Sequence, residues 1–227
     1  MNSSRGRPRT FCTDTALDKA MAVFWKHGFQ GASLAELTAE MGLNKPSLYA
    51  AYGDKEALYL KVLARYAEQY VKTCLAKLDA EADVKQAVGA YLRSVVDMQT
   101  NPELPGGCLI LKSAGECSST SSQALNDARQ VVMQLNRTKL QERLVQAQAE
   151  GQLTASTHID DLVDLFLTMA SGFAIMAQTG SKYEQLETVI ETVLKMWPVT
   201  ALKPTSIAPE VRLPPRKVSN KKPVSNK

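Results

Sequence analysis

The stretch LNKPSLYAAYGDKEAL, from Leu43 to Leu58, gathers groups that bind phosphate into a few residues. Its cations can neutralise phosphates and its hydroxyl groups can donate hydrogen bonds to phosphate oxygens; these residues are Lys45, Lys55, Ser47, Tyr49 and Tyr52. Base edges would be read by Lys45, Pro46, Ser47 and Tyr49, because lysine can bind guanine and proline can touch a thymine methyl group. The chemistry that this stretch predicts is therefore DNA binding.

The elements around this stretch have the pattern of a helix-turn-helix unit. Ser33-Leu-Ala-Glu36 is a capping box that predicts a helix over residues 34–41, and Gly42 and Leu43 form a turn. Asn44 can cap a second short helix over residues 45–52, with Pro46 in its first turn, where a missing N–H has no cost. In such a unit the second helix lies in the major groove of DNA, and helix N-termini also offer N–H groups to phosphates.

These residues carry a family resemblance. The run LAELTAEMGLNKPSLYAAYGDKEALYLKVL resembles the DNA-binding domain of the tetracycline-repressor (TetR/AcrR) family of bacterial transcriptional regulators. The family's HGF-x-G-x-S-L motif at the start of the unit is matched by residues 27–37, and its motif at the end of the unit by residues 48–58. The specific match covers about residues 14–63. The resemblance implies a homodimer that binds a pseudo-palindromic double-stranded DNA operator through two recognition helices, with half-sites about 34–36 Å apart or modestly more.

A basic N-terminal arm precedes this unit. Arg5-Gly6-Arg7-Pro8-Arg9 is similar to the short segments that enter narrow A·T minor grooves, and we favour a DNA contact over a merely solvated terminus. The complete set of predicted DNA contacts is Arg5, Arg7, Arg9, Ser33, Leu34, Asn44, Lys45, Pro46, Ser47, Tyr49, Tyr52 and Lys55.

The distribution of charge and proline divides the chain into four parts. The net charge of the 227 residues is +4, yet residues 198–227 hold seven Lys or Arg and one acid, which makes this proline-rich tail basic. We predict a flexible basic arm (1–12), a helix-turn-helix domain (13–55), a helical regulatory and dimerisation domain (56–197) and a disordered basic tail (198–227). We interpret the tail as a solubilising segment in preference to a second DNA contact.

Helical propensity and periodicity predict an all-α protein of about nine helices. The expected helices cover residues 13–27, 34–41, 45–52, 55–79, 83–100, 107–117, 121–149, 157–179 and 183–197.

Two apolar stripes predict the dimer interface. They lie on the last two expected helices, which could form a four-helix bundle with their copies in a second subunit. The alternative is an intramolecular core. The residues of the two stripes are Leu162, Leu165, Phe166, Met169, Phe173 and Met176, then Val189, Ile190, Val193, Leu194 and Trp197.

The regulatory part contains a candidate sensor, Cys108, in the sequence PGGCLILK. A helix N-terminus and the ammonium of Lys112 would both favour the thiolate, and hence reaction with an electrophile or oxidant. Cysteine is also commonly a small buried hydrophobic residue, so this reading competes with a purely structural one. A small-molecule inducer could instead occupy a cavity lined by Met98, Leu104, Phe166, Met169 and Phe173, although these residues describe a packed core equally well.

Enzyme chemistry has little support in the sequence. His27 and His158 show no metal-ligand spacing, and we expect no catalytic residues, no metal and no cofactor. A small enzyme and a helical adaptor that does not bind DNA remain the alternatives to a regulator. The first residues lack the apolar segment of a signal peptide, and residues 162–177 are too few and too polar to span a bilayer. We therefore expect a cytoplasmic protein without a membrane partner.

Overall fold

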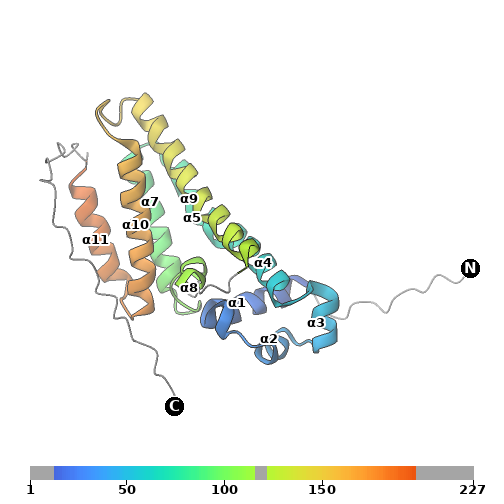
Figure 1. Cartoon of the computed structure of the whole chain (residues 1–227). Helices are drawn as coiled ribbons and strands as arrows, with labels where there is room; N and C mark the ends of the chain where they lie inside the picture. Colours follow the sequence, from blue (N-terminus) through green and yellow to red (C-terminus); the bar gives the residue numbers. More distant parts are fainter. Residues whose placement is uncertain (1–12, 116–121, 198–227) are drawn as a thin grey trace, which may run out of the picture.

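A computed structural model describes residues 13–115 and 122–197, and all regular elements in these two ranges are helical (Figure 1). The predicted all-α class is thus confirmed. The arm (1–12), the tail (198–227), Cys117 and the expected helix ends at residues 116, 117 and 121 lie outside the described residues. The elements are α1 (Thr13–Gly31), α2 (Leu34–Met41), α3 (Lys45–Tyr52), α4 (Lys55–Tyr66), η1 (Ala67–Val71), α5 (Lys72–Leu75), α6 (Lys77–Ala80), α7 (Val84–Thr100), α8 (Leu109–Gly115), α9 (Gln123–Ala149), α10 (Ile159–Gln178) and α11 (Tyr183–Lys195).

The helix-turn-helix unit forms with the bounds expected from its caps. The Ser33 hydroxyl accepts a hydrogen bond from Glu36 N at 3.1 Å and starts α2, and Asn44 Oδ1 accepts one from Ser47 N at 2.8 Å and starts α3. Between them Gly42 takes a left-handed conformation (φ 67°), which glycine adopts without strain. The unit packs against α1 at one end of the molecule (Figure 1), and Lys61 Nζ of α4 donates to the Tyr52 backbone oxygen at 3.5 Å.

An aromatic cluster joins α1 to α4. The Phe24 ring meets the Tyr59 ring edge-on at 4.8 Å, and the Trp25 ring meets the Tyr66 ring at 4.9 Å and 90°. All four side chains are buried. Edge-to-face pairs of this kind stabilise beyond the area that they bury. The cluster therefore fixes α4, which leads into the regulatory helices, against the helix that carries the DNA-binding unit.

The regulatory helices α7, α9, α10 and α11 lie side by side beyond this junction (Figure 1). Helix α11 packs closely on α7 at Gly89. A Cβ atom at this position would come within 2.9 Å of the Leu194 side chain, so glycine leaves room for this leucine. Arg93 adds ion pairs from α7 to Glu187, at 3.2 Å, and to Glu191 on α11. None of the helices in the described part of the chain is both long and apolar enough to cross a membrane.

The segment expected as one helix over residues 55–79 is interrupted. After Tyr66 the backbone makes a π-helical turn, and it continues through the short helices α5 and α6 to Ala80. A π-helical turn is often found at functional sites. Here Tyr66, at its start, and Val71, at its end, both lie on the wall of the same cavity.

Candidate functional site

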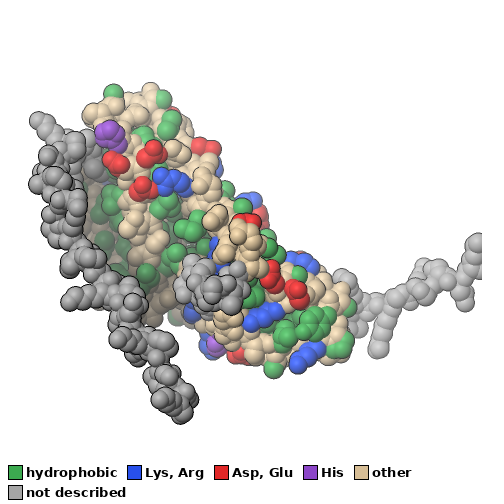
Figure 2. Space-filling view, in the orientation of Figure 1, with side chains coloured by type: hydrophobic (Ala, Val, Ile, Leu, Met, Phe, Trp, Pro, Cys, Tyr) green, Lys and Arg blue, Asp and Glu red, His purple; other side chains and the backbone are tan. Residues whose placement is uncertain are grey.

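Helix α3 presents one side to solvent and buries the other. Lys45, Pro46 and Tyr49 are exposed, with 47% of Tyr49 accessible, and Ser47 is half-buried. Leu48 is fully buried and anchors the helix. Figure 2 shows basic and hydrophobic side chains together on the surface at this end of the molecule. The structure therefore brings Lys45, Pro46, Ser47 and Tyr49 onto one accessible helix, as a groove-reading element requires.

The structure does not place Tyr52 among the groups that are available to DNA. Its side chain is buried and its hydroxyl donates to the backbone oxygen of Thr13 at 2.8 Å, which ties the end of α3 to the start of α1. Residues three apart in a helix are neighbours on its surface, so the spacing of Tyr49 and Tyr52 is compatible with one shared face. Packing against α1 separates them, and Tyr52 is a core residue.

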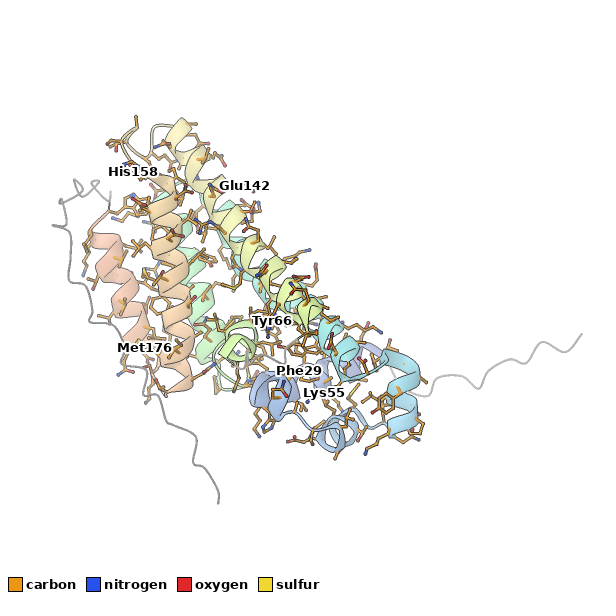
Figure 3. All side chains as sticks on the ribbon, in the orientation of Figure 1. Phe29, Lys55, Tyr66, Glu142, His158 and Met176 are labelled. Carbon is orange, nitrogen blue, oxygen red and sulfur yellow. The ribbon has the colours of Figure 1, made fainter. Side chains whose placement is uncertain are left out.

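The side chains at the other predicted contacts have structural partners of their own. Lys55 Nζ donates to the Gln30 backbone oxygen at 3.4 Å and lies 4.8 Å from the centre of the Phe29 ring (Figure 3). Ser33 and Asn44 are exposed at helix N-termini, where their oxygens serve as caps, and Leu34 is half-buried beside Ser33. Arg5, Arg7 and Arg9 lie outside the described residues. The predicted DNA contacts other than Tyr52 stay predictions.

A cavity of about 120 Å³ lies among the regulatory helices. Met98, one of the five residues expected to line a ligand cavity, lies on its wall, and so does the candidate sensor Cys108. The remaining wall residues include polar and aromatic side chains that the sequence analysis did not single out: Tyr66, Cys74, Tyr91, Gln99 and Asn136. They come from helices far apart in the sequence, and the chain offers no local pattern that assembles them.

The other predicted ligand residues do not lie on this wall. Phe166 and Phe173 are buried in the helix core, and Met169 packs against it. Leu104 lines two other surface hollows, next to α11 and next to α1. Periodicity identified these residues as apolar and inward-facing but did not reveal which of them meet a void.

Lys112 has a different role from the one expected. Its ammonium donates to the backbone oxygen of Lys26 at 2.6 Å, near the end of the first part of α1, before the non-helical Gly28. A cation there compensates the free carbonyl groups of a helix C-terminus. The residue thus links α8 to α1, and its ammonium is held by that carbonyl oxygen.

Cys108 contacts Tyr66 at the cavity wall, where α4 and α8 meet (Figure 3 labels Tyr66). The Tyr66 hydroxyl lies 3.5 Å from Cys108 Sγ and 3.9 Å from Met98 Sδ. Burial, and then the nearby Cys108 thiol, raise the pKa of Tyr66 well above its ordinary value, so that this hydroxyl stays protonated. Burial also raises the pKa of the Cys74 thiol, which keeps it in its unreactive form.

Helices α10 and α11 leave apolar side chains uncovered. Leu165, Met176 and Val189 are exposed, and Met169, Val193 and Trp197 are half-buried. Leu162, Phe173, Ile190 and Leu194, which were also expected in the dimer interface, are buried within the subunit. The structure adds two exposed residues that the stripes missed, Ile175 (61% accessible) and Met196 (69% accessible). We name the exposed set Leu165, Ile175, Met176, Val189 and Met196 the α10–α11 face.

Within residues 13–115 and 122–197, no three His, Cys, Asp or Glu side chains are grouped so that they could hold an ion.

Two family models match the chain. Residues 16–62 match the model of bacterial regulatory proteins of the tetR family, and residues 84–193 match the tetracyclin repressor-like C-terminal domain. The HTH-type transcriptional repressor ComR of Escherichia coli (strain K12) is 33% identical over 199 residues, which are 87% of this chain and 94% of ComR. The chain belongs to the TetR family.

Solved structures extend the similarity to the three-dimensional fold. A cysteine mutant of the TetR family transcriptional regulator CifR, complexed with 26-base-pair double-strand operator DNA, is 37% identical and superposes with a TM-score of 0.80 over 85% of this chain and 100% of that one. The reduced form of Escherichia coli NemR, at 22% identity and a TM-score of 0.69 over 79% of this chain and 93% of NemR, shares the fold. Members of the TetR family are transcriptional regulators, and this chain is one of them.

Proposed function

We propose that this TetR-family regulator is a repressor that binds a pseudo-palindromic operator as a homodimer. The observation that supports this most directly is the exposed side of α3, where Lys45, Pro46 and Tyr49 reach solvent and Ser47 is half-buried, while Leu48 and Tyr52 anchor the helix in the core. ComR, which is named a repressor, and CifR, which was crystallised with operator DNA, point to the same activity.

The dimer forms, in this proposal, through the α10–α11 face. Apolar side chains of this size exposed together on two neighbouring helices are uncommon on a monomer and typical of an interface. The inner residues of α11 are fixed on α7 by the Arg93 ion pairs and by the close approach at Gly89, so the face is held by a rigid support. Two such pairs of helices would bury one another as a four-helix bundle.

Operator release begins, in this proposal, at the cavity, through a small molecule or modification of Cys108. Cys108 touches Tyr66, whose ring packs on Trp25 of α1, and Lys112 of the following helix bonds to Lys26 of α1. A group that enters the cavity or enlarges the Cys108 side chain therefore acts on two contacts with the DNA-binding unit. A ligand that prefers the conformer with the wrong separation of the recognition helices weakens operator binding.

The proposal places the protein in the cytoplasm, where its DNA target is, and assigns it no catalytic activity. A small enzyme or a helical adaptor would leave the exposed side chains of α3 without a role.

Two tyrosine hydroxyl groups on α3 provide a matched test. Tyr49→Phe is expected to weaken operator binding about tenfold or more, since each subunit loses one hydrogen bond to a phosphate, a charged acceptor. Tyr52→Phe removes the same atom three residues away, where it donates to Thr13 O. It should lower the free energy of unfolding by about 1 kcal/mol and leave operator affinity unchanged. Band-shift titration and urea unfolding measure both, and equal operator affinity for the two variants would contradict the groove assignment.

A cysteine pair tests the sensor. Treatment with N-ethylmaleimide is expected to release the wild-type protein and Cys74→Ser from operator DNA, whereas Cys108→Ser should stay bound. Cys74 is the control because it lies on the same cavity wall, but burial raises its pKa. Fluorescence anisotropy of a labelled operator follows release. Equal release of Cys108→Ser and wild type would reject Cys108 as the sensor and leave the DNA-binding proposal standing.

A further inference from the structure

The wall of the cavity among the regulatory helices carries no charge. The residues around it are apolar, aromatic, thiol, hydroxyl or amide side chains, without Lys, Arg, His, Asp or Glu in the part of the chain that the structure describes. An ion buried there would lose its hydration without gaining a partner of opposite charge. The wall therefore selects an uncharged ligand.

The volume limits the size of that ligand. The cavity measures about 120 Å³. An apolar cavity of about 150 Å³ in another protein holds one benzene molecule. A ligand of a single six-membered ring with one small substituent is thus comparable in size to this cavity.

One buried polar atom of the wall lacks a partner. The Gln99 side chain is 3% exposed and donates through Nε2 to the Ala170 backbone oxygen at 3.3 Å. Its Oε1 has no hydrogen-bond partner among the described residues. A buried acceptor without a donor costs about 1–3 kcal/mol, and such atoms in native proteins usually have an unseen partner.

The neighbouring polar groups of the wall are already engaged. Asn136 Nδ2 donates to Val132 O at 3.0 Å, the Tyr91 hydroxyl donates to Asn136 Oδ1 at 3.4 Å, and Ser171 Oγ donates to Leu167 O at 2.8 Å. A ligand that offers one donor pairs with Gln99 Oε1 once the amide turns this buried oxygen toward the cavity. The Gln99 backbone oxygen also accepts a hydrogen bond from Gly107 N at 2.9 Å, so Gln99 contacts the residue directly before Cys108.

We propose that the cavity binds a small uncharged ring compound with a single hydroxyl or N–H group, which donates to Gln99 Oε1 while the ring packs against the apolar wall. Bound in this position, the compound covers the Cys108 thiol and presses on Tyr66. The inference deepens the proposed function, on which it rests, by naming the chemical class of the inducer and the atom that selects it.

Phenol and toluene test this selection in the full-length protein, because they have equal numbers of heavy atoms and differ in the donor. Dissociation constants are measured by calorimetry for wild type and for Gln99→Met, which keeps the side-chain length and removes the acceptor. The ratio of the toluene constant to the phenol constant should fall at least tenfold in Gln99→Met. Asn136→Leu removes the other amide of the wall. In this variant the ratio of the toluene constant to the phenol constant should stay closer to the wild-type ratio than it does in Gln99→Met. An unchanged ratio in Gln99→Met, or no binding of phenol to the wild type, would overturn the proposal.

A second measurement needs no variant and decides the matter if Gln99→Met does not fold. Saturating phenol should slow alkylation of Cys108 by N-ethylmaleimide at least tenfold, followed by mass spectrometry of the Cys108 peptide; an unchanged rate would count against the site. Operator binding without phenol is measured separately. If the protein binds the operator and phenol fails both assays, this inference alone is wrong. If the protein does not bind the operator, the proposed function fails, whatever the result with phenol.

Discussion

Val189→Asp is expected to convert the protein to a monomer and to weaken operator binding at least about a hundredfold. Val189 lies on the α10–α11 face, and a carboxylate there would be buried without a partner when the two subunits meet. A monomer brings one recognition helix to the operator instead of two, and the second helix of a linked pair typically adds about 10²–10⁴ in affinity. Analytical ultracentrifugation gives the oligomeric state, and anisotropy with the full operator gives the affinity.

Val131→Asp is the matched control for this experiment. It makes the same change at a valine that is also exposed but lies on α9, away from the proposed interface. This variant should remain a dimer with wild-type operator affinity. If Val189→Asp sediments as a dimer, or if both variants lose operator affinity equally, the α10–α11 face is not the interface.

The DNA-binding unit could be predicted from the sequence because its signals are local. Ser33 and Asn44 cap helices within three residues of themselves, Gly42 occupies a turn that favours glycine, and Pro46 stands where no N–H is needed. Each of these signals involves neighbours in the chain, and the bounds of α2 and α3 agree with the expected ranges. The side-chain environment of Tyr52 could not be predicted in the same way, since its partner Thr13 lies 39 residues away.

The cavity and the interface depend on contacts between distant segments. An apolar residue on α10 can face the core, a void or a second subunit, and its periodicity is the same in all three cases. Thus Phe166 is buried and Leu165, its neighbour, is exposed, although both belonged to one predicted stripe. Gln99 is a polar residue near the end of α7, and nothing in its local sequence indicates that it contacts Ala170 and lines a cavity.

A buried cation on α9 was missed for the same reason. Arg143 is only 6% exposed, and its guanidinium donates to Leu78 O at 3.0 Å, Glu81 O at 3.1 Å and Ala82 O at 2.7 Å. These oxygens lie at the end of α6 and in the turn that follows, where the helix leaves carbonyl groups unpaired. Arg143 therefore closes the turn between α6 and α7.

Arg143→Met is expected to lower the free energy of unfolding by about 2–4 kcal/mol, because three carbonyl groups lose one charged donor while the side chain keeps most of its volume. Urea unfolding followed by circular dichroism, at one protein concentration for all variants, measures the change. Arg137→Met is the control on the same helix. Arg137 pairs at the surface with Asp164, and loss of an exposed ion pair should have little effect. If the two substitutions shift the unfolding midpoint equally, the guanidinium of Arg143 does not hold the α6–α7 turn, and the backbone there must find its donors in water.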